Sequence, residues 1–570
     1  MKWVYKQKSP SIKSSLEFDS VISELLKIRG IDNAKKAEKY LHPKLSDLPD
    51  IYLLPNLKKA AKQILKALKN KEKIVIYGDY DVDGISSSAI LFDFIYRKLK
   101  GNVTPYIPNR FDEGYGLNDK ALESIFDGGA KLLITVDCGI RDAKIVNKFA
   151  KKGLKIIISD HHSLPKGKMG FTDDVIVVHP SLPKSKYPNK AICAANVAWK
   201  IVLAMCDNIK VDFDPNSYID IVALATVCDV MPLLDENRII VKFGLEKMKS
   251  TNNQGLANIL LRNNLDLAKL DAYHLGFILG PRLNAAGRME DALIALRFLT
   301  SYDQNTVMAL GDKLEILNRE RQALTAKYMQ NAEIQAFEQI GKGHKLLSII
   351  GEEWSEGIIG LVAGKLSEKF HMPTISISVQ KNSITGSARS INGFNITEAI
   401  SNFQEMLERF GGHSQAAGFS VKSGMLEKFT KALQTFANKT IDSKKIEKEL
   451  SIDLILSEDY LNLDFANKLD TLKPFGYGNT APIFCVKNLK ATKVVKMGSQ
   501  QQHIKIFTMT PKGRMIEAVA FNRPELADLA IKYEKIDIAC TIDINQWNNQ
   551  ESIQLNVKDI KKSSKIKNGK

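Results

Sequence analysis

The chain has 570 residues, too many for one ordinary hydrophobic core, so about two to four domains are expected. Its formal charge of +17, from 81 Lys and Arg against 64 Asp and Glu, favours a polyanionic partner, although lysine is also a common solvated surface residue. The sequence has no apolar run of about 18 residues and no apolar stretch behind its N-terminal lysines, so we expect neither a membrane span nor a secretory signal. The six cysteines form no CxxC pair and indicate a reducing, cytoplasmic compartment.

The first 290 residues predict an N-terminal arm followed by a parallel α/β domain. Residues 1–70 indicate short helices and loops that pack on a neighbouring domain. Over residues 71–290, β-branched runs alternate at first with helix-like segments, which is typical of a parallel sheet. These runs are KIVIYGD (73–79), KLLITVD (131–137), LKIIISD (154–160) and VIVVHP (175–180). Three of the four end on an aspartate, and chemistry gathers at the carboxyl ends of such strands.

The second half of the chain predicts three further parts. Residues 291–340 form a long, amphipathic and charged pattern, which indicates a connecting helix. Residues 341–445 start a second, smaller α/β domain with KLLSIIG, a helical stretch and PTISISV. Regular short strands over residues 446–562 indicate a β-barrel, for which an OB-fold is the first candidate. The lysine-rich residues 563–570 predict a disordered basic tail.

Carboxylates and histidines occur together in four segments of the first half of the chain. They are Asp79, Asp81 and Asp83 in GDYDVDG; Asp137 in TVDCG; Asp160, His161 and His162 in SDHH; and Asp229 in TVCDVMP. Converging carboxylates need a cation to neutralise them. Oxygen and imidazole ligands suit Mn²⁺ or Mg²⁺, and imidazole leaves zinc or cobalt open. Two ions that share a carboxylate would promote phosphodiester hydrolysis, and Asp160 is a candidate acceptor for a ligating histidine.

Each segment also has a plainer explanation. DxDxDG is typical of a calcium loop, but Ile90 stands where such a loop needs a glutamate. Adjacent histidines are often surface residues, and a strand-end aspartate often caps a helix. Such features on three successive strand ends favour a functional site instead. GLVAGK (360–365) is one residue short of a P-loop, so no nucleoside triphosphate is expected.

The motifs resemble those of the DHH phosphoesterase family. GDYDVDG, TVDCG, SDHH and TVCDVMP match its four motifs in order. The RecJ branch in particular is indicated by PNRFDEGYG (108–116), GPRLNAAGRM (280–289), GSARSINGF (386–394), LERFGGHSQAAGFS (407–420) and LKPFGYGN (472–479). The resemblance runs from about residue 40 to residue 560. It implies a 5′-to-3′ exonuclease of single-stranded DNA in repair and recombination, which releases mononucleotides and uses two Mn²⁺ or Mg²⁺ ions.

The resemblance also implies roles for the residues of the four segments. Asp81 and Asp137 would hold one ion, and Asp83, Asp137, His161 and Asp229 would hold the other, so that Asp137 bridges the pair. His162 would face the scissile phosphate, and Asp160 and Asp79 would complete the catalytic group.

Basic and glycine-rich segments are candidates for DNA contacts. Arg389 and His413 are expected to contact phosphate, with donors from Ser387, Ser390 and an anion-binding nest at Gly411 and Gly412. Arg110 and Tyr115 are expected to hold the 5′ end and to stack a base. Arg282, Asn284 and Arg288 belong to a small-residue turn that would grip the strand backbone. The plainer alternative for each arginine is an interdomain salt bridge.

Two other functions fit parts of the pattern. One is a phosphoesterase for short oligoribonucleotides or cyclic dinucleotides, although such a substrate needs neither the barrel nor the arm. The other is a non-catalytic replication or repair scaffold that only binds DNA. For the exonuclease we expect a monomer without a membrane partner, assisted by a helicase and a single-strand-binding protein.

Overall fold

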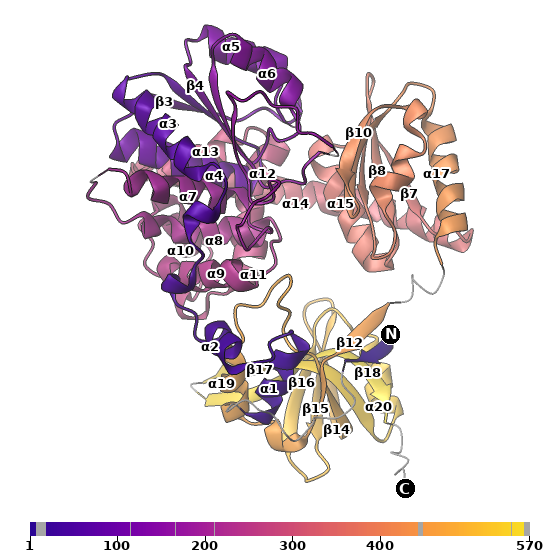
Figure 1. Cartoon of the computed structure of the whole chain (residues 1–570). Coiled ribbons are helices and arrows are strands. Elements are labelled where there is room, and N and C mark those ends of the chain that lie inside the picture. The colour runs from indigo at the N-terminus through magenta and orange to yellow at the C-terminus, as the bar shows by residue number, and fades with distance from the viewer. Residues whose placement is uncertain are drawn as a thin grey trace. The chain divides into compact units, whose positions relative to one another are not determined.

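The computed structural model describes residues 1–6, 19–114, 116–165, 167–209, 211–442, 448–548 and 550–563. The chain forms two compact units (Figure 1). One unit combines Met1–Asp47 with Glu447–Lys570, and the other comprises Leu48–Ile446. The arm expected over residues 1–70 is thus divided between the two units. In the described parts of the chain, no helix has the length and apolar character needed to cross a membrane.

The larger unit begins with a five-stranded parallel sheet in the order β3-β2-β4-β5-β6. Its strands are β2 (Ile74–Tyr77), β3 (Val103–Tyr106), β4 (Leu132–Val136), β5 (Lys155–Ser159) and β6 (Ile176–Val178). The sequence prediction missed β3, a short edge strand that contains a proline. Around the sheet lie η2 (Ile51–Leu53), α3 (Leu57–Lys69), α4 (Val82–Phe92), η3 (Asp93–Lys98), α5 (Asp119–Asp127), α6 (Ala143–Lys151) and α7 (Ala194–Cys206). The parallel sheet confirms the predicted α/β class.

A helical region follows the sheet. Its elements are η4 (Pro215–Tyr218), α8 (Ile219–Cys228), α9 (Asp235–Met248), α10 (Gln254–Arg262), η5 (Leu267–Lys269), α11 (Ala272–His274), η6 (Leu275–Leu279), α12 (Gly280–Met289), α13 (Leu293–Thr300) and α14 (Gln304–Gly341). GPRLNAAGRM therefore forms the helix α12 and not the expected turn. The long helix is α14, with 38 residues, and Asp303 caps it by accepting a hydrogen bond from the Thr306 amide at 2.8 Å.

The second α/β domain carries a five-stranded sheet in the order β10-β11-β9-β8-β7, in which β7 and β8 are parallel and the other neighbours are antiparallel. Its elements are β7 (Leu347–Glu352), α15 (Glu356–Phe370), β8 (Thr374–Val379), β9 (Ile384–Arg389), α16 (Ile396–Ser401), η7 (Gln404–Met406), β10 (Leu407–His413), β11 (Ala416–Val421) and α17 (Leu426–Thr440). Figure 1 shows α14 running from the first domain to this one.

The smaller unit is built on a closed barrel. Its five strands are β14 (Phe484–Met497), β15 (His503–Met509), β16 (Met515–Ala520), β17 (Ile536–Trp547) and β18 (Gln550–Lys562), and β13 (Leu454–Leu456) pairs in parallel with β14 outside the ring. β14 pairs with both β15 and β17, which closes the five-stranded barrel of the predicted OB-fold. The accompanying helices are η8 (Glu458–Tyr460), α19 (Leu463–Asp470) and α20 (Leu526–Lys532).

The N-terminal residues complete this smaller unit. β1 (Lys2–Tyr5) pairs in parallel with β12 (Glu449–Ile452). Side chains of α1 (Ser20–Ile28) and α2 (Ala34–Leu41) share one hydrophobic core with the barrel, and η1 (Leu45–Asp47) follows them. The first 47 residues are therefore part of the barrel unit. Apart from Ser563, the predicted basic tail lies outside the described residues.

Candidate active site

The loops that follow β2, β4 and β5 bring carboxylates together at the carboxyl edge of the parallel sheet. Asp137 and Asp160 directly follow β4 and β5. Asp81 is the N-cap of α4, and its Oδ1 accepts hydrogen bonds from the amides of Asp83 at 2.9 Å and Gly84 at 3.2 Å. Asp81 therefore does cap a helix, which is the plainer explanation given above for such an aspartate. Capping fixes one carboxylate oxygen and leaves the other for a ligand.

Two further carboxylates, Asp83 and Asp229, are positioned by helix ends. Asp83 accepts hydrogen bonds from the amides of Ala194 at 2.6 Å and Ala195 at 2.8 Å, at the start of α7. Asp229 is the C-cap of α8. Asp137 has a φ of +64°, in the left-handed region that residues other than glycine rarely adopt. Such backbone strain is characteristic of functional sites, because the surrounding structure must hold it in place.

The imidazole of His161 lies among three of these carboxylates. Its Nε2 is 3.1 Å from Oδ1 of Asp137, 3.5 Å from Oδ2 of Asp229 and 3.6 Å from Oδ2 of Asp83. Burial, and secondarily the charge of His162, lowers the pKa of His161 to about 4. The ring is therefore neutral near pH 7, which is the form that binds a metal.

The carboxylates lie close together, and some of their oxygens accept no hydrogen bond. Burial and then neighbouring carboxylates raise the pKa values of Asp79, Asp83, Asp137 and Asp229. Among the described residues, Oδ1 of Asp79 and Oδ2 of Asp229 are buried and accept no hydrogen bond. Buried carboxylate oxygens without donors fit a cation site.

The donor atoms are close enough to hold metal ions. Three triads have ligand atoms within 4.8 Å of one another: Asp137, His161 and His162; Asp83, His161 and Asp229; and Asp79, Asp81 and Asp137. The triads overlap at Asp137 and His161. The set contains oxygen and imidazole donors without a thiolate, which suits Mn²⁺ or Mg²⁺.

His162 is oriented by Asp160. Nδ1 of His162 lies 2.9 Å from Oδ1 of Asp160, and Asp160 also accepts hydrogen bonds from the amides of Ile140 at 3.0 Å and His161 at 2.7 Å. Burial disfavours both charges, but the hydrogen bond and the mutual attraction prevail. They hold the pKa of Asp160 below its usual range and raise the pKa of His162. Asp160 thus sets the orientation of a ring at the edge of the carboxylate cluster.

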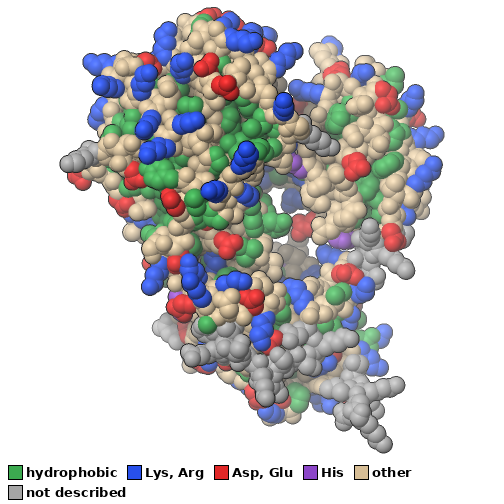
Figure 2. Space-filling model, viewed as in Figure 1, with side chains coloured by type: hydrophobic (Ala, Val, Ile, Leu, Met, Phe, Trp, Pro, Cys, Tyr) green, Lys and Arg blue, Asp and Glu red, His purple; other side chains and the backbone are tan. Residues whose placement is uncertain are grey.

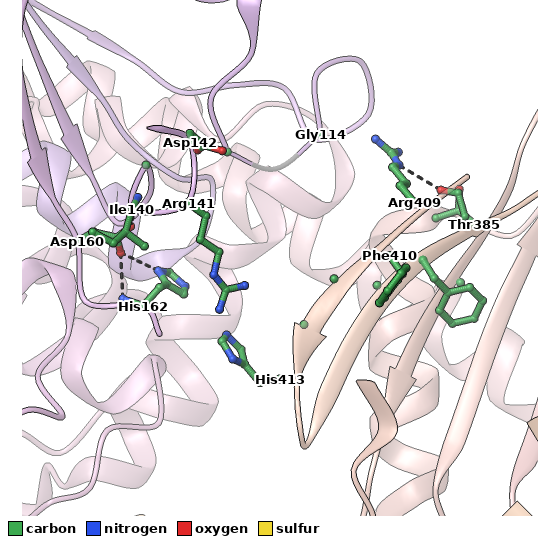
Figure 3. Close-up of a pocket in the computed structure, with 18 residues that line it drawn as sticks. Gly114, Ile140, Arg141, Asp142, Asp160, His162, Thr385, Arg409, Phe410 and His413 are labelled. Atoms are coloured by element: carbon green, nitrogen blue, oxygen red, sulfur yellow. Dashed lines mark hydrogen bonds and ion pairs between the residues drawn. The ribbon is translucent and has the colours of Figure 1, made fainter. Parts of the chain in front are cut away.

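A pocket of about 630 Å³ opens beside His162, between the two domains of the larger unit (Figure 3). The ring of His413 on β10 lies nearly parallel to that of His162, with 6.4 Å between the centroids. Figure 2 shows the hollow between these domains, with histidine side chains at its edge. The opposite wall includes Gly411, Gly412 and Gly418, where the strands β10 and β11 present backbone without side chains.

Three arginines from distant parts of the sequence, Arg110, Arg288 and Arg389, form a cluster centred on Arg288, and the charges of Arg110 and Arg288 act on Asp79 and Asp81 respectively. The guanidinium carbon of Arg110 is 4.0 Å from the ring centroid of Tyr80, and Arg288 donates to the Gly357 carbonyl at 3.2 Å. Burial, and then the charges of Arg110 and Arg389, lower the pKa of Arg288 to about 9. Among the described residues, none of the three arginines forms an ion pair with a carboxylate. Clustered guanidinium groups without a carboxylate in direct contact fit an anion such as phosphate.

Other expected DNA contacts have structural partners. Arg282 donates to Glu315 at 2.6 Å and to the Ile278 carbonyl at 2.7 Å, so it is held on α14 by an ion pair. The Ser390 hydroxyl donates to the Phe394 carbonyl at 2.6 Å.

The expected nest at Gly411 and Gly412 is instead part of β10, in register with Gly418 and Ala417 of β11. Because β10 is an edge strand, alternate amides still point away from the sheet. Ser387 lies on β9 and packs closely against α15. A Cβ added to Gly360 of that helix would lie 3.0 Å from the hydroxyl oxygen of Ser387. Tyr115 lies outside the described residues.

The helix α12 packs directly on the loop that carries Asp81. Oδ1 of Asn284 accepts a hydrogen bond from the Val82 amide at 3.2 Å. A Cβ on Gly287 would lie 2.5 Å from the carbonyl oxygen of Tyr80. Small residues in α12 therefore permit a close approach of this helix to the loop that carries Asp81, and Asn284 fixes the loop by a hydrogen bond.

Sequence reasoning missed several residues of the site. Arg141, Arg409 and Phe410 line the pocket (Figure 3). Arg141 comes four residues after Asp137 in the same strand-end loop, and Arg409 lies within LERFGGHSQAAGFS, so position within known motifs could have identified both. Arg321 on α14 has a buried Nε without a hydrogen-bond partner and lies near Arg282 and Arg288.

Three family models match the chain. The DHH family N-terminal domain matches residues 73–226, the DHHA1 domain matches residues 342–439 and the RecJ OB domain matches residues 452–559. The first contains Asp79, Asp81, Asp83, Asp137, Asp160, His161 and His162 but ends before Asp229.

Relatives and solved structures agree with these matches over nearly the whole chain. The chain is 34% identical to the single-stranded-DNA-specific exonuclease RecJ of Bacillus subtilis, over 98% of this chain and 70% of that one. It is similar in structure to RecJ of Thermus thermophilus in complex with Mn²⁺, with a TM-score of 0.83, 26% identity and coverage of 100% of this chain and 81% of that one. For the Mg²⁺ complex from the same organism, the TM-score is 0.78 and the identity 25%, over 99% of this chain and 79% of that one.

Proposed function

The chain belongs to the RecJ family, and on that premise we propose that it is a metal-dependent exonuclease of single-stranded DNA. The observation that carries the proposal is the contact of His161 with Asp83, Asp137 and Asp229, beside orphaned carboxylate oxygens. A site of this composition binds divalent ions and suits phosphodiester hydrolysis.

We assign two ions to the cluster. Asp81 and Asp137 would hold one, and Asp83, Asp137, His161 and Asp229 the other. The overlap of the ligand triads at Asp137 supports its role as the bridge. Bound ions would activate a water and stabilise the leaving oxygen. The family's structures with Mn²⁺ and with Mg²⁺ support these two metals.

The remaining residues position the strand. His162, oriented by Asp160, would donate a hydrogen bond to the scissile phosphate. The convergence of Arg110, Arg288 and Arg389 supports a terminal phosphate as their ligand. A phosphate held there would set the reacting end of the strand. We propose the 5′ end, with release of mononucleotides, on the support of the family resemblance.

The proposed activity also bears on the assisting proteins, the oligomeric state and the compartment. A site between two domains that admits one strand would need duplex DNA to be opened first, which favours assistance by a helicase and a single-strand-binding protein in repair and recombination. We propose a monomer in the cytoplasm. Six free cysteines, all in the described residues, support a reducing compartment.

The decisive experiment is digestion of one oligonucleotide labelled separately at each end. We expect the full chain to degrade the single strand with Mn²⁺ or Mg²⁺, to release labelled mononucleotide first from the 5′ label, and to stop with chelator. A matching duplex and a dinucleotide serve as competing substrates. Preference for the dinucleotide would favour a small-substrate phosphoesterase instead.

Substitution at the proposed bridge tests the site. Asp137→Ala should abolish hydrolysis and leave binding of the single strand largely intact, because the arginines are untouched. Full activity in this variant would refute the assignment. Asp173→Asn, at an exposed position, is the control and should retain normal activity.

A further inference from the structure

An exposed pair of aromatic rings lies on the helical segment that precedes α12. Tyr273 and Phe277 are 60% and 69% exposed, and their rings stack with 4.8 Å between centroids and an interplanar angle of 22°. Isolated exposed aromatics are common on protein surfaces. Two stacked rings, each more than half exposed, offer a flat apolar surface of the kind on which nucleobases stack.

The segment beneath the rings is held by local hydrogen bonds and by buried leucines. Asp271 and His274 form a capping box at its start, and Leu275 and Leu279 are fully buried on its inner side. The Asp271 carboxylate lies 2.6 Å from Nδ1 of His274. The rings therefore sit on a fixed support, so that stacking on them orders few additional groups.

The same segment packs against the end of α8, which carries Asp229. The Cys228 thiol donates to the Leu275 carbonyl at 3.6 Å, and a Cβ on Gly280 would lie 2.4 Å from that sulfur. A Cβ on Gly276, next to Phe277, would lie 3.4 Å from a methyl carbon of Val227. The aromatic pair is thus attached to the residues immediately before a proposed metal ligand.

The helix α12 continues from this segment towards the arginine cluster. Residues three or four apart share one side of a helix, which places Phe277, Asn284 and Arg288 along one side of the rod. At a rise of 1.5 Å per residue, Phe277 and Arg288 are roughly 16 Å apart along the axis. This spacing allows one strand to contact a phosphate site at one end and the aromatic pair at the other.

We infer that Tyr273 and Phe277 form a base-stacking subsite for nucleotides of the single strand away from the reacting end. The inference rests on the proposed exonuclease function. It assigns the bases, recognised by stacking and without sequence preference, to a surface distinct from the metal ligands and the arginines. A dinucleotide held at the arginines is too short to reach it, whereas a 20-nucleotide strand is long enough.

Chain-length dependence tests this inference. Phe277→Ala should raise KM for a 20-nucleotide single strand by about tenfold, the size of one lost base–aromatic stack, with little change in kcat. Hydrolysis of a 5′-phosphorylated dinucleotide should be unchanged. Phe277→Trp should behave like the wild type, and Phe277→Leu should behave like Phe277→Ala, because stacking requires an aromatic ring.

Phe337→Ala is a matched control, because Phe337 is 59% exposed on α14 and contacts another aromatic ring, Phe370. It should leave both substrates unaffected. An unchanged KM for the long strand in both Phe277→Ala and Tyr273→Ala would overturn the inference, and so would equal loss on the dinucleotide. Failure of the wild type to degrade the long strand would instead refute the proposed function.

Photocrosslinking of a 5-iodouracil-substituted strand, in chelator, should label Tyr273 or Phe277, and labelling confined to other residues would also contradict the inference.

Discussion

Asp160 accepts a hydrogen bond from Nδ1 of His162 at 2.9 Å, while its other oxygen accepts one from the Ile140 amide at 3.0 Å. The carboxylate thus ties a histidine at the pocket to the loop after β4. This arrangement fixes the ring orientation, and Asp160 lines the same pocket as His162.

Asp160→Asn should lower kcat by about 10- to 100-fold, as is typical for loss of a residue that orients a site histidine. The amide keeps the size of the side chain but removes the charge that attracts the imidazolium. Steady-state kinetics with Mn²⁺ would measure the effect, and thermal unfolding would verify the fold. A normal kcat would show that His162 needs no such partner.

Removing an unpaired arginine should change the salt dependence of binding. Arg389→Ala should weaken binding of a single strand and lower the slope of log K against log salt by about 0.7, the value for one lost phosphate contact. Arg282→Ala is the control: because Glu315 already pairs with Arg282, its slope should stay unchanged. Equal slopes in the wild type and Arg389→Ala would argue against a phosphate contact.

The close approach of α12 to the loop that carries Asp81 should make Gly287 intolerant of a side chain. Gly287→Ala would place a Cβ 2.5 Å from the Tyr80 carbonyl oxygen, and overpacking of this kind costs about 1–3 kcal/mol. We expect a lower Tm and a marked loss of kcat, because the displaced loop carries proposed metal ligands. Gly341→Ala, where a Cβ meets nothing within 4 Å, should unfold at the same or a slightly higher temperature and stay active.

The crowded carboxylates should make stability depend on metal. Mn²⁺ should raise the Tm of the wild type, since an ion that binds only the folded state stabilises it. In chelator, Asp229→Asn should raise the Tm by relieving repulsion with Asp83, yet reduce the shift that Mn²⁺ produces. Differential scanning calorimetry with and without Mn²⁺ measures both effects. A lower Tm of the variant in chelator would indicate that Asp229 has a stabilising partner.

The cluster of carboxylates and histidines was predictable because neighbouring parallel strands align their carboxyl ends, which brings aspartates that follow those strands together. Asp137 and Asp160 illustrate this directly. β3 was missed because Pro105 interrupts its β-branched pattern. The helix α12 was mistaken for a turn because its glycines and asparagine favour turns in isolation, whereas in the fold they permit contact with Tyr80 and Val82.

The sequence pattern did not predict contacts between side chains that are far apart in the chain. Nothing in the residues near Arg282 identifies Glu315 as its partner, and nothing near Arg288 identifies Arg110 and Arg389 as its neighbours. These relationships depend on how α12, α14 and β9 pack, which local periodicity does not encode. The division of the first 70 residues between the two units has the same cause.

The parallel pairing of β1 with β12 has a consequence for biosynthesis. Val4 is in register with Ser451, so the first strand emerges from the ribosome long before its partner exists. At about 5–20 residues per second, the delay is roughly 20 to 90 s. The larger unit, Leu48–Ile446, lies between the two segments of the smaller unit, so its synthesis is complete before the barrel strands are made. We therefore expect nascent chains to acquire the catalytic domains first, while β1 and the helices that follow it wait for the barrel to be translated.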